Sequence, residues 1–272
     1  MPIAGISQGL GIGGGTSATI SGAPAGGFSE VYSCKFDDSD DELAVDGTLT
    51  ALGAATSFTI SLWADSDQAS GAGHWTLFSC GTPVYKADRI WWVWGNNKSY
   101  FTAGGPAGTQ KSASVTLSHP SSTFHHMVAV RDGDYVTLYV DGGTAAGGSQ
   151  CAPVDFSAVS MPQSAYADDV LIGRYNAGQY TFNGNIDEVA VWDSALSAGT
   201  IADIYNSGVP TDLSSLSPVA WWRMGDSAGD TEDGGGAVTD GGTVGTVKNA
   251  ADPGVNDATG NNGTIYEAYV PS

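Results

Sequence analysis

The best metal-ligand candidates in this chain of 272 residues are four aspartates that lie close together: Asp37, Asp38, Asp40 and Asp41. Calcium takes six to eight hard oxygen ligands, and a turn with several carboxylates and its own backbone carbonyls supplies them. The alternative is an acidic turn that contacts only solvent. If the turn binds a metal, we expect one Ca²⁺ ion.

Aromatic residues form a second group with possible chemistry, because their planar rings can stack on sugar rings. The group is close together in the sequence and consists of Trp75, Trp91, Trp92, Trp94, Tyr100 and Phe101. Tryptophans on alternating faces of a strand are mostly core residues, so we favour core for this group as a whole. The candidate carbohydrate-binding residues within it are Trp92, Trp94 and Tyr100.

The charge of the chain excludes two classes of partner. Nine Lys and Arg stand against 29 Asp and Glu, which gives a formal net charge of −20. Such a field repels phosphate backbones and anionic lipid headgroups, so we expect no nucleic-acid binding and no membrane docking. Three cysteines that lie far apart, an odd number, predict reduced thiols and folding in a cytosol.

The elements that position these residues are predicted to be strands. Glycine is abundant, with 39 residues, and charged residues make up 14% of the chain, a balance that favours turns over long charged helices. Residues 1–28 have too little apolar surface to order alone, so we expect an arm that is either a disordered tail or a tether to a partner subunit. From residue 31 to about 209, short β-type runs alternate with turn residues, as in a sandwich or barrel.

Three segments carry more detailed predictions. Residues 58–63 alternate, which puts Phe58, Ile60 and Leu62 on one face of a strand. Residues 125–141 predict a hairpin with Asp132-Gly133 in a tight primed turn and Val130 opposite Tyr135. Both faces of this hairpin are apolar, so both must be covered. Residues 197–208 predict the one helix, which Ser197 caps and Gly208 ends.

Five ordered blocks of the sequence resemble the laminin-G-like family, which has the concanavalin A-like jelly-roll fold. The blocks read SCKFDDSDDELAV at 33–45, FTISLW at 58–63, FHHMVAVRDG at 124–133 with LYVDG at 138–142, IGR at 172–174, and FNGNIDEVAVW at 182–192 followed by LS at 196–197. The sequence departs from the family pattern at Asp38, where the family usually has Gly, and at Phe124, where it has Trp.

The resemblance implies an all-β fold, a two-sheet antiparallel jelly-roll sandwich with one short helix, over residues 29–217. It also implies one bound calcium ion, and the positions that match the family motif are Asp37, Asp40, Asp41 and Asp187. Glucanases with this fold use two glutamates at short spacing, and no two of the five glutamates here approach it. Asp187 and Glu188 should point to opposite faces of their strand. We therefore expect no enzyme, although an inverting pair of aspartates stays open.

The last part of the chain resembles a segment that normally precedes the first strand of the family. The matching residues are 220–226 and 257–265. We therefore predict that residues 218–272 are a permuted segment that completes the sandwich or exchanges with a neighbouring subunit, which would make the chain an oligomer.

This permuted order, with WWRMGD ahead of GNNGTI, also resembles virion structural proteins of tailed marine bacteriophages. That resemblance implies a non-enzymatic virion subunit, a capsid decoration, head-fibre or tail-associated protein that folds in the host cytoplasm. It would bind other virion proteins through residues 1–28, form a homo-oligomer and present its sandwich to host-surface glycans. The alternative is a calcium-dependent carbohydrate-binding lectin domain of a marine bacterium.

Overall fold

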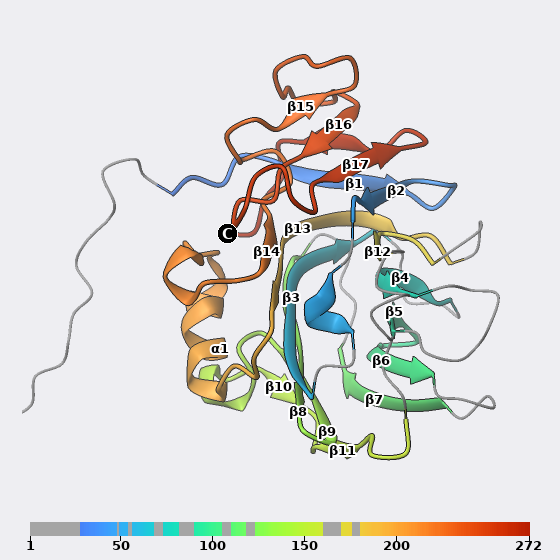
Figure 1. Cartoon of the computed structure of the whole chain (residues 1–272), viewed down its shortest axis with the longest axis vertical. Helices are drawn as coiled ribbons and strands as arrows, with labels where there is room; N and C mark the ends of the chain where they lie inside the picture. Colours follow the sequence, from blue (N-terminus) through green and yellow to red (C-terminus); the bar gives the residue numbers. More distant parts are fainter. Residues whose placement is uncertain are drawn as a thin grey trace, which may run out of the picture.

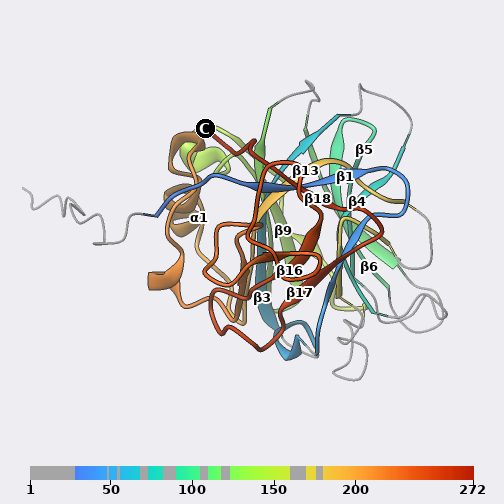
Figure 2. The same cartoon turned by 90° about the horizontal axis from the view of Figure 1, so that it is seen from above.

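Two antiparallel sheets of nine strands each face one another across a shared hydrophobic core (Figures 1 and 2). This computed structural model describes residues 28–47, 49–53, 56–67, 73–81, 90–104, 110–117, 123–159, 170–175 and 180–272. Within these residues there is one α-helix, α1 (Ala198–Tyr205). The predicted all-β sandwich with one short helix is confirmed.

The first sheet, sheet A, contains the longest strands. Its order is β10 (Ser149–Gln150), β9 (Tyr135–Val140), β8 (His125–Asp132), β3 (Ser57–Ser66), β13 (Asn183–Trp192), β1 (Ser33–Asp37) and β18 (Ile265–Glu267). Two more strands lie off this path: β11 (Val154–Asp155) pairs with β9, and β14 (Ala220–Trp222) pairs with β13.

The second sheet, sheet B, brings together strands from the two ends and the middle of the chain. Its order is β15 (Thr231–Glu232), β16 (Val244–Val247), β17 (Ala258–Asn261), β2 (Glu42–Val45), β12 (Val170–Ile172), β4 (Trp75–Cys80), β5 (Ile90–Gly95), β6 (Lys98–Gly104) and β7 (Gln110–Thr116). Short 3₁₀ turns join parts of both sheets: η1 (Thr50–Leu52), η3 (Thr144–Ala146), η4 (Asn206–Gly208) and η5 (Ser214–Leu216).

The core lies between the sheets because alternate residues of each strand point inward. In β3, Phe58, Ile60 and Leu62 are all fully buried in this core, as their alternation predicted. Trp92 and Trp222 fill it from opposite sheets, at 1% and 0% exposure. Burial of side chains of this size, at about 25 cal/mol per Å² of apolar surface, is the main source of stability of such a sandwich.

The hairpin of β8 and β9 is covered on both faces, as predicted. On its inner face Ala129 and Leu138 belong to the core between the sheets. On its outer face Val128 and Val130 pack against Ile201 of α1. Figure 1 shows α1 on the outer side of sheet A.

The predicted register of this hairpin is wrong by two residues. Asp132 pairs with Tyr135, so Val130 lies opposite Thr137 and the turn residues are Gly133 and Asp134. Gly133 has φ 59, a left-handed conformation that glycine adopts at no steric cost. The glycine therefore takes the first turn position rather than the second. A shift of two residues keeps each side chain on its predicted face.

The helix α1 begins where the sequence predicts. Ser197 is its N-cap, and the Ser197 hydroxyl accepts a hydrogen bond from the Thr200 amide at 3.1 Å. The helix ends at Asn206, which has φ 44, and not at the predicted Gly208. Asparagine is among the few other residues that adopt this left-handed conformation readily, so it ends the helix two residues earlier.

Strands from residues 218–272 belong to both sheets of the same chain. In sheet A, β14 pairs with β13 and β18 pairs with β1; in sheet B, β17 pairs with β2. Figure 1 shows these strands in orange and red, packed against the blue strands of the early chain. Among the described residues, no helix is long and apolar enough to cross a membrane. The predicted arm, residues 1–28, lies outside the described residues except for Phe28.

Candidate functional site

Three acidic side chains meet at an irregularity of β13. The pairing of β13 with β3 shifts register between Asp187 and Ala190, and Glu188 has φ 49. This β-bulge overturns the prediction that Asp187 and Glu188 point to opposite faces, because the extra residue breaks the alternation of the strand. Carboxylate oxygens of Glu30, Asp187 and Glu188 lie within 4.8 Å of one another.

Four of the six oxygens of these three carboxylates accept hydrogen bonds from described residues. Arg223 donates from Nε to Glu188 at 3.0 Å and from Nη2 to Glu30 at 2.8 Å. Trp221 Nε1 donates to the other Glu188 oxygen at 2.5 Å. Asp187 Oδ1 accepts from the Glu188 amide at 2.8 Å. Asp187 Oδ2 and Glu30 Oε2 are buried and have no hydrogen-bond partner among the residues that the structure describes.

Asp187 has no exposed surface, and within the described part of the chain no cation contacts its second oxygen. Burial, and then the nearby carboxylates of Glu30 and Glu188, raise the pKa of Asp187 well above its usual range. The donor set consists of oxygens alone, which is the chemistry that Ca²⁺ prefers. The cluster of Glu30, Asp187 and Glu188, called the carboxylate cluster below, therefore fits a calcium ion chemically.

The structure does not assemble the calcium ligands predicted from the motif. Asp37 pairs with Asn183 in the β1–β13 ladder, and Asp187 lies four residues further along β13. At roughly 3.3 Å per residue, Asp187 is about 13 Å from the turn that holds Asp37, Asp40 and Asp41. Calcium binds its ligands at about 2.3–2.6 Å, so one ion cannot bind this set. The predicted four-aspartate site is therefore wrong as a single site.

The acidic turn itself is held together by its own carboxylates. Asp41 accepts from the Asp37 amide, and Asp37 accepts from the Ser39 amide, both at 2.9 Å. Burial, followed by the charge of Asp37, raises the pKa of Asp41 to about 6. Asp38 has φ 65, a left-handed conformation that glycine adopts without steric cost, which fits the glycine that the family pattern has at this position.

Two of the three predicted carbohydrate-binding residues lie in the core. Trp92 and Trp94 are 1% and 0% exposed and point inward from β5. A ring between the two sheets cannot stack on a sugar from solvent, so the prediction is wrong for these two residues. Tyr100 is half-buried and pairs with Val93, a position that faces away from the core.

Tyr100 belongs to a group of rings on the outer side of sheet B. Trp91 of β5 lies 5.1 Å from the Tyr175 ring and 5.2 Å from the Tyr180 ring, between centroids. His74 lies 6.2 Å from Tyr100 and 5.9 Å from Trp91. Tyr180 is 44% exposed. We call this group the aromatic face, and it consists of His74, Trp91, Tyr100, Tyr175 and Tyr180.

Hydroxyl groups hold and border the aromatic face. The indole nitrogen of Trp91 donates to the Thr76 hydroxyl at 2.9 Å, which fixes the ring on the sheet. Thr102 and Ser112, on the neighbouring strands β6 and β7, share a hydrogen bond of 2.8 Å. Fixed rings beside hydroxyls present both the flat apolar surface and the polar groups of a sugar-binding surface.

The fold agrees with the comparison to protein families. A model of the concanavalin A-like lectin/glucanases superfamily matches residues 37–202. The chain belongs to the concanavalin A-like lectin/glucanase superfamily. The resemblance seen in the sequence is thereby confirmed at the level of the family. A search of the curated proteins found no match.

Three solved structures to which this chain is similar come from other proteins. A candidate carbohydrate-binding protein from Bacteroides ovatus has a TM-score of 0.59 and 19% identity, and the match covers 90% of this chain and 62% of that one. The CBM40 domain of the Ruminococcus gnavus IT-sialidase, solved with α2,3-sialyllactose, has a TM-score of 0.49 and 16% identity over 63% of this chain and 96% of that domain. A heptameric pentraxin from Limulus polyphemus also has a TM-score of 0.49 and 16% identity, over 65% of this chain and 82% of that chain. The chain thus spans 62% of the length of the Bacteroides ovatus chain.

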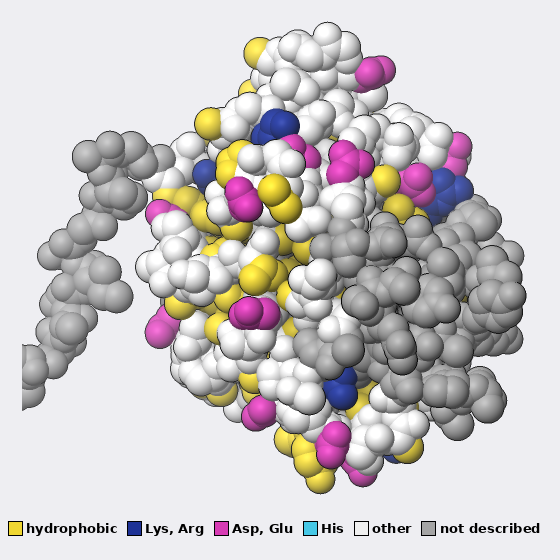
Figure 3. All heavy atoms as spheres, in the orientation of Figure 1, with side chains coloured by type: hydrophobic (Ala, Val, Ile, Leu, Met, Phe, Trp, Pro, Cys, Tyr) yellow, Lys and Arg dark blue, Asp and Glu magenta, His cyan; other side chains and the backbone are white. Residues whose placement is uncertain are grey.

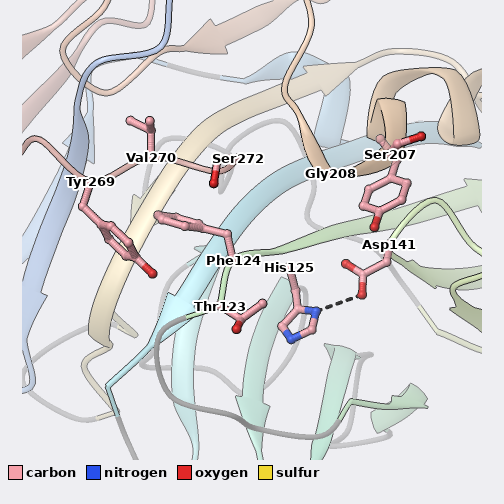
Figure 4. Close-up of a pocket in the computed structure, with 10 residues that line it drawn as sticks. Thr123, Phe124, His125, Asp141, Ser207, Gly208, Tyr269, Val270 and Ser272 are labelled. Carbon is pink, nitrogen blue, oxygen red and sulfur yellow. Dashed lines mark hydrogen bonds and ion pairs between the residues drawn. The ribbon is translucent and has the colours of Figure 1, made fainter.

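A pocket of about 420 Å³ lies at one rim of the superfamily sandwich (Figure 4). Phe124 and Tyr269 form part of its wall, with ring centroids 5.0 Å apart. His125 donates from Nδ1 to the Asp141 carboxylate at 2.9 Å, the dashed contact in Figure 4. Asp141 also accepts from the His126 amide at 3.2 Å. The Asp141 carboxylate is therefore already bonded to the start of β8 and is less available to a ligand. For this reason the aromatic face is the better candidate binding site.

His126 follows His125 of this pocket, and it makes the free energy of unfolding depend on pH. It is fully buried, its ring lies 4.9 Å from that of Trp63, and its Nε2 shares a 2.8 Å hydrogen bond with Ser61. Burial lowers its pKa to about 3, against the weaker opposing charge of Asp141. Below pH 6.5 the unfolded chain binds a proton here and the folded chain does not, so stability present above pH 6.5 is lost as pH falls towards 3.

We expect His126→Gln to flatten this dependence. Between pH 6.5 and 5.5 the wild type should lose about 1 kcal/mol more unfolding free energy than the variant, because over this interval the histidine of the unfolded chain goes from about half to about nine-tenths protonated while the folded chain binds no proton there. Urea unfolding at both pH values measures the difference. Equal losses in both proteins would contradict a neutral, buried His126.

Proposed function

We propose that this chain is a non-enzymatic carbohydrate-binding domain and that the aromatic face is its glycan-binding surface. The observation that carries the proposal is the cluster of rings around Trp91 on the outer side of sheet B. Trp91 is held by Thr76, so stacking a sugar on it requires little ordering of the side chain. Membership of a superfamily with lectins agrees with this reading.

The charge around the aromatic face favours acidic glycans. The strands β4 to β7 contain Lys98 and Lys111 and no Asp or Glu, in a chain of net charge −20. Lys98 is exposed and lies two residues before Tyr100 in β6, hence on the same face. Elsewhere acidic side chains outnumber basic ones, as on the surface shown in Figure 3. A glycan with carboxylate or sulfate groups would be attracted to this region and repelled by the rest.

Binding without hydrolysis is supported by the state of the carboxylates. Glu188 is 2% exposed and is bonded to Arg223, and Asp187 is fully buried. A general acid or base needs to reach the substrate within hydrogen-bond distance. Neither residue can do so from inside the protein.

The test is binding to a small set of polysaccharides, measured by affinity electrophoresis and calorimetry. The probes are polygalacturonic acid, a sulfated carrageenan and neutral laminarin. We expect the two acidic polymers to bind more tightly than laminarin, and Trp91→Ala to weaken binding about 10- to 100-fold, since stacking on one aromatic ring is worth about 1–3 kcal/mol. No probe should release reducing ends on incubation with the protein.

Tyr135→Ala is the matched control. Tyr135 is also an exposed aromatic residue, at 51%, but it lies in β9 of sheet A. Its loss should leave binding unchanged. Failure of all three polymers to bind, or equal binding by the Trp91→Ala variant, would refute the aromatic face as the binding surface. Release of reducing ends would refute the absence of hydrolysis.

A virion role stays a second proposal. It rests on the resemblance of the permuted segment to phage virion proteins and on the Gly-rich residues 1–28. In such a particle the sandwich would face outward and the aromatic face would contact host-surface glycans. Attachment to other virion proteins, assembly into a homo-oligomer and location in a virion all belong to this proposal.

A further inference from the structure

His74 has a central place in the aromatic face. Its ring centroid lies 5.9 Å from that of Trp91, 6.2 Å from that of Tyr100 and 6.3 Å from that of Tyr180. The residue is exposed, so a sugar that stacks on Trp91 comes within reach of the imidazole nitrogens. Among the five residues of the aromatic face, His74 is the one whose side chain can carry a positive charge.

The backbone holds His74 at this place. A Cβ on Gly95 would lie 2.0 Å from the carbonyl oxygen of Gly73 and 3.3 Å from the Cα of His74, so glycine is needed there. The segment just before β4 therefore lies directly against the end of β5. Because backbone contact fixes its position, His74 loses little conformational freedom when a ligand binds beside it.

The strands around His74 supply a cation and no anion. Lys98 is exposed and lies on the same face of β6 as Tyr100. The strands β4, β5 and β6 contain no Asp or Glu. A protonated His74 would therefore add its charge to that of Lys98 and would not form an ion pair with a carboxylate of these strands.

The charged groups next to Tyr175 and Tyr180 are already bonded. Arg174 is paired with Glu42 at 3.2 Å. Asp38 accepts a hydrogen bond from the Thr181 hydroxyl at 3.4 Å. The other titratable groups of the aromatic face are tyrosine phenols, a type of group that titrates near pH 10. Of the groups on this face, the imidazole is thus the type that changes charge near neutral pH.

We propose that His74 is the residue by which the aromatic face selects anionic glycans, and that their binding tightens as the pH falls. Histidine side chains take up a proton between about pH 8 and pH 5. The imidazolium would then pair with a carboxylate or sulfate group of a sugar stacked on Trp91, whereas a neutral sugar would gain nothing from the charge. The inference rests on the proposed function of the aromatic face and adds the residue that sets its specificity.

The experiment measures binding of the full chain to sulfated carrageenan by calorimetry at pH 7.5 and pH 5.5. Sulfate groups keep their charge at both pH values, so a change in affinity comes from the protein. We expect the Kd to fall about threefold at pH 5.5, the effect of one exposed ion pair. The change should become smaller in 0.5 M NaCl, because salt screens exposed charges. Neutral laminarin should bind equally at both pH values.

Two substitutions of His74 test the charge directly. His74→Gln cannot take up a proton, so it should lose the tightening between pH 7.5 and pH 5.5. His74→Lys is charged at both pH values and should bind carrageenan at pH 7.5 about as tightly as the wild type does at pH 5.5. His125→Gln, in the rim pocket, is the matched control and should keep the pH dependence of the wild type.

Other groups of the chain also take up protons in this range. Burial raises the pKa of Asp41 and of Asp230 to about 6, and it raises the pKa of the acidic groups in the carboxylate cluster. Their protonation lowers the net negative charge and so weakens the repulsion of any anionic glycan. All of these groups remain in His74→Gln, so a pH dependence that this variant loses belongs to His74.

Two results would overturn the role of His74 and leave the proposed function intact. One is a wild-type affinity for carrageenan that is equal at pH 7.5 and pH 5.5, and the other is an unchanged pH dependence in His74→Gln. In both cases Trp91→Ala would still weaken binding, which keeps the aromatic face as the binding surface. Equal binding by Trp91→Ala, or no binding of any probe at either pH, would overturn both proposals.

Discussion

A chain that ends at Ser217 is expected to lose the sandwich altogether. The removed part contains β14, β17 and β18, which pair with the central strands β13, β2 and β1. It also contains Trp222 and Tyr266, both fully buried. Loss of one buried large aromatic side chain costs about 3–5 kcal/mol, and a whole domain is stable by about 5–15 kcal/mol. The truncated chain should show no cooperative urea transition and no near-ultraviolet circular dichroism.

Removal of residues 1–27 is the comparison at the other end. The strand pairings described above lie within residues 33–267, and we expect the shortened chain to unfold with the same midpoint as the full chain. A cooperative transition in the chain that ends at Ser217 would mean that residues 29–217 fold alone. It would also mean that the pairings of β14, β17 and β18 are not needed for the core.

Asp230→Ala is expected to be the most damaging single substitution of a polar residue in the C-terminal segment. Its Oδ2 accepts from the amides of Gly225 and Ser227, both at 3.0 Å, and its Oδ1 accepts from the Lys248 amide at 2.6 Å. Asp230 is 8% exposed, so water does not replace it at all three donors. Each buried donor left without a partner costs about 1–3 kcal/mol, and we expect a loss of about 3 kcal/mol or more in unfolding free energy.

Asp233→Ala tests whether this loss is specific. Asp233 lies three residues away and its side chain is exposed, so its removal should change the unfolding free energy by less than about 0.5 kcal/mol. Urea titration of both variants at pH 7 measures the two values. Similar losses in both would show that the carboxylate of Asp230 does not hold the segment.

Local patterns in the sequence predicted local structure well. The alternation of Phe58, Ile60 and Leu62 placed one face of β3 in the core, and Ser197 marked the start of α1. Both predictions depend on residues close together in the chain, where the period of a strand and the capping of a helix act directly. The hairpin register failed by two residues, because either position of the turn accepts Gly133 and only the full set of strand pairs selects one.

The aromatic face could be predicted only in part. Residues 90–94 are apolar on both faces, so the alternation does not tell which tryptophans point inward. Ile90, Trp92 and Trp94 fill the core, which leaves Trp91 outside. His74, Tyr175 and Tyr180 come from segments outside β5 and β6, and no spacing rule connects them to Trp91. Of the aromatic face, Tyr100 alone was among the three candidate binding residues, although Trp91 belonged to the wider aromatic group in the sequence.

The sequence by itself determined the family, the two-sheet class, the cap of α1 and the acidic charge of the chain, because each depends on composition or on short ordered motifs. Only the tertiary structure decided which carboxylates meet. Asp187 and Glu188 are brought together by a bulge that appears in the pairing of β13 with β3, and Glu30 reaches them from the other end of the chain. Motif spacing grouped Asp187 with Asp37 instead, since it takes no account of the register that separates them. Register is set by the packing of a whole sheet, and no short segment contains that information.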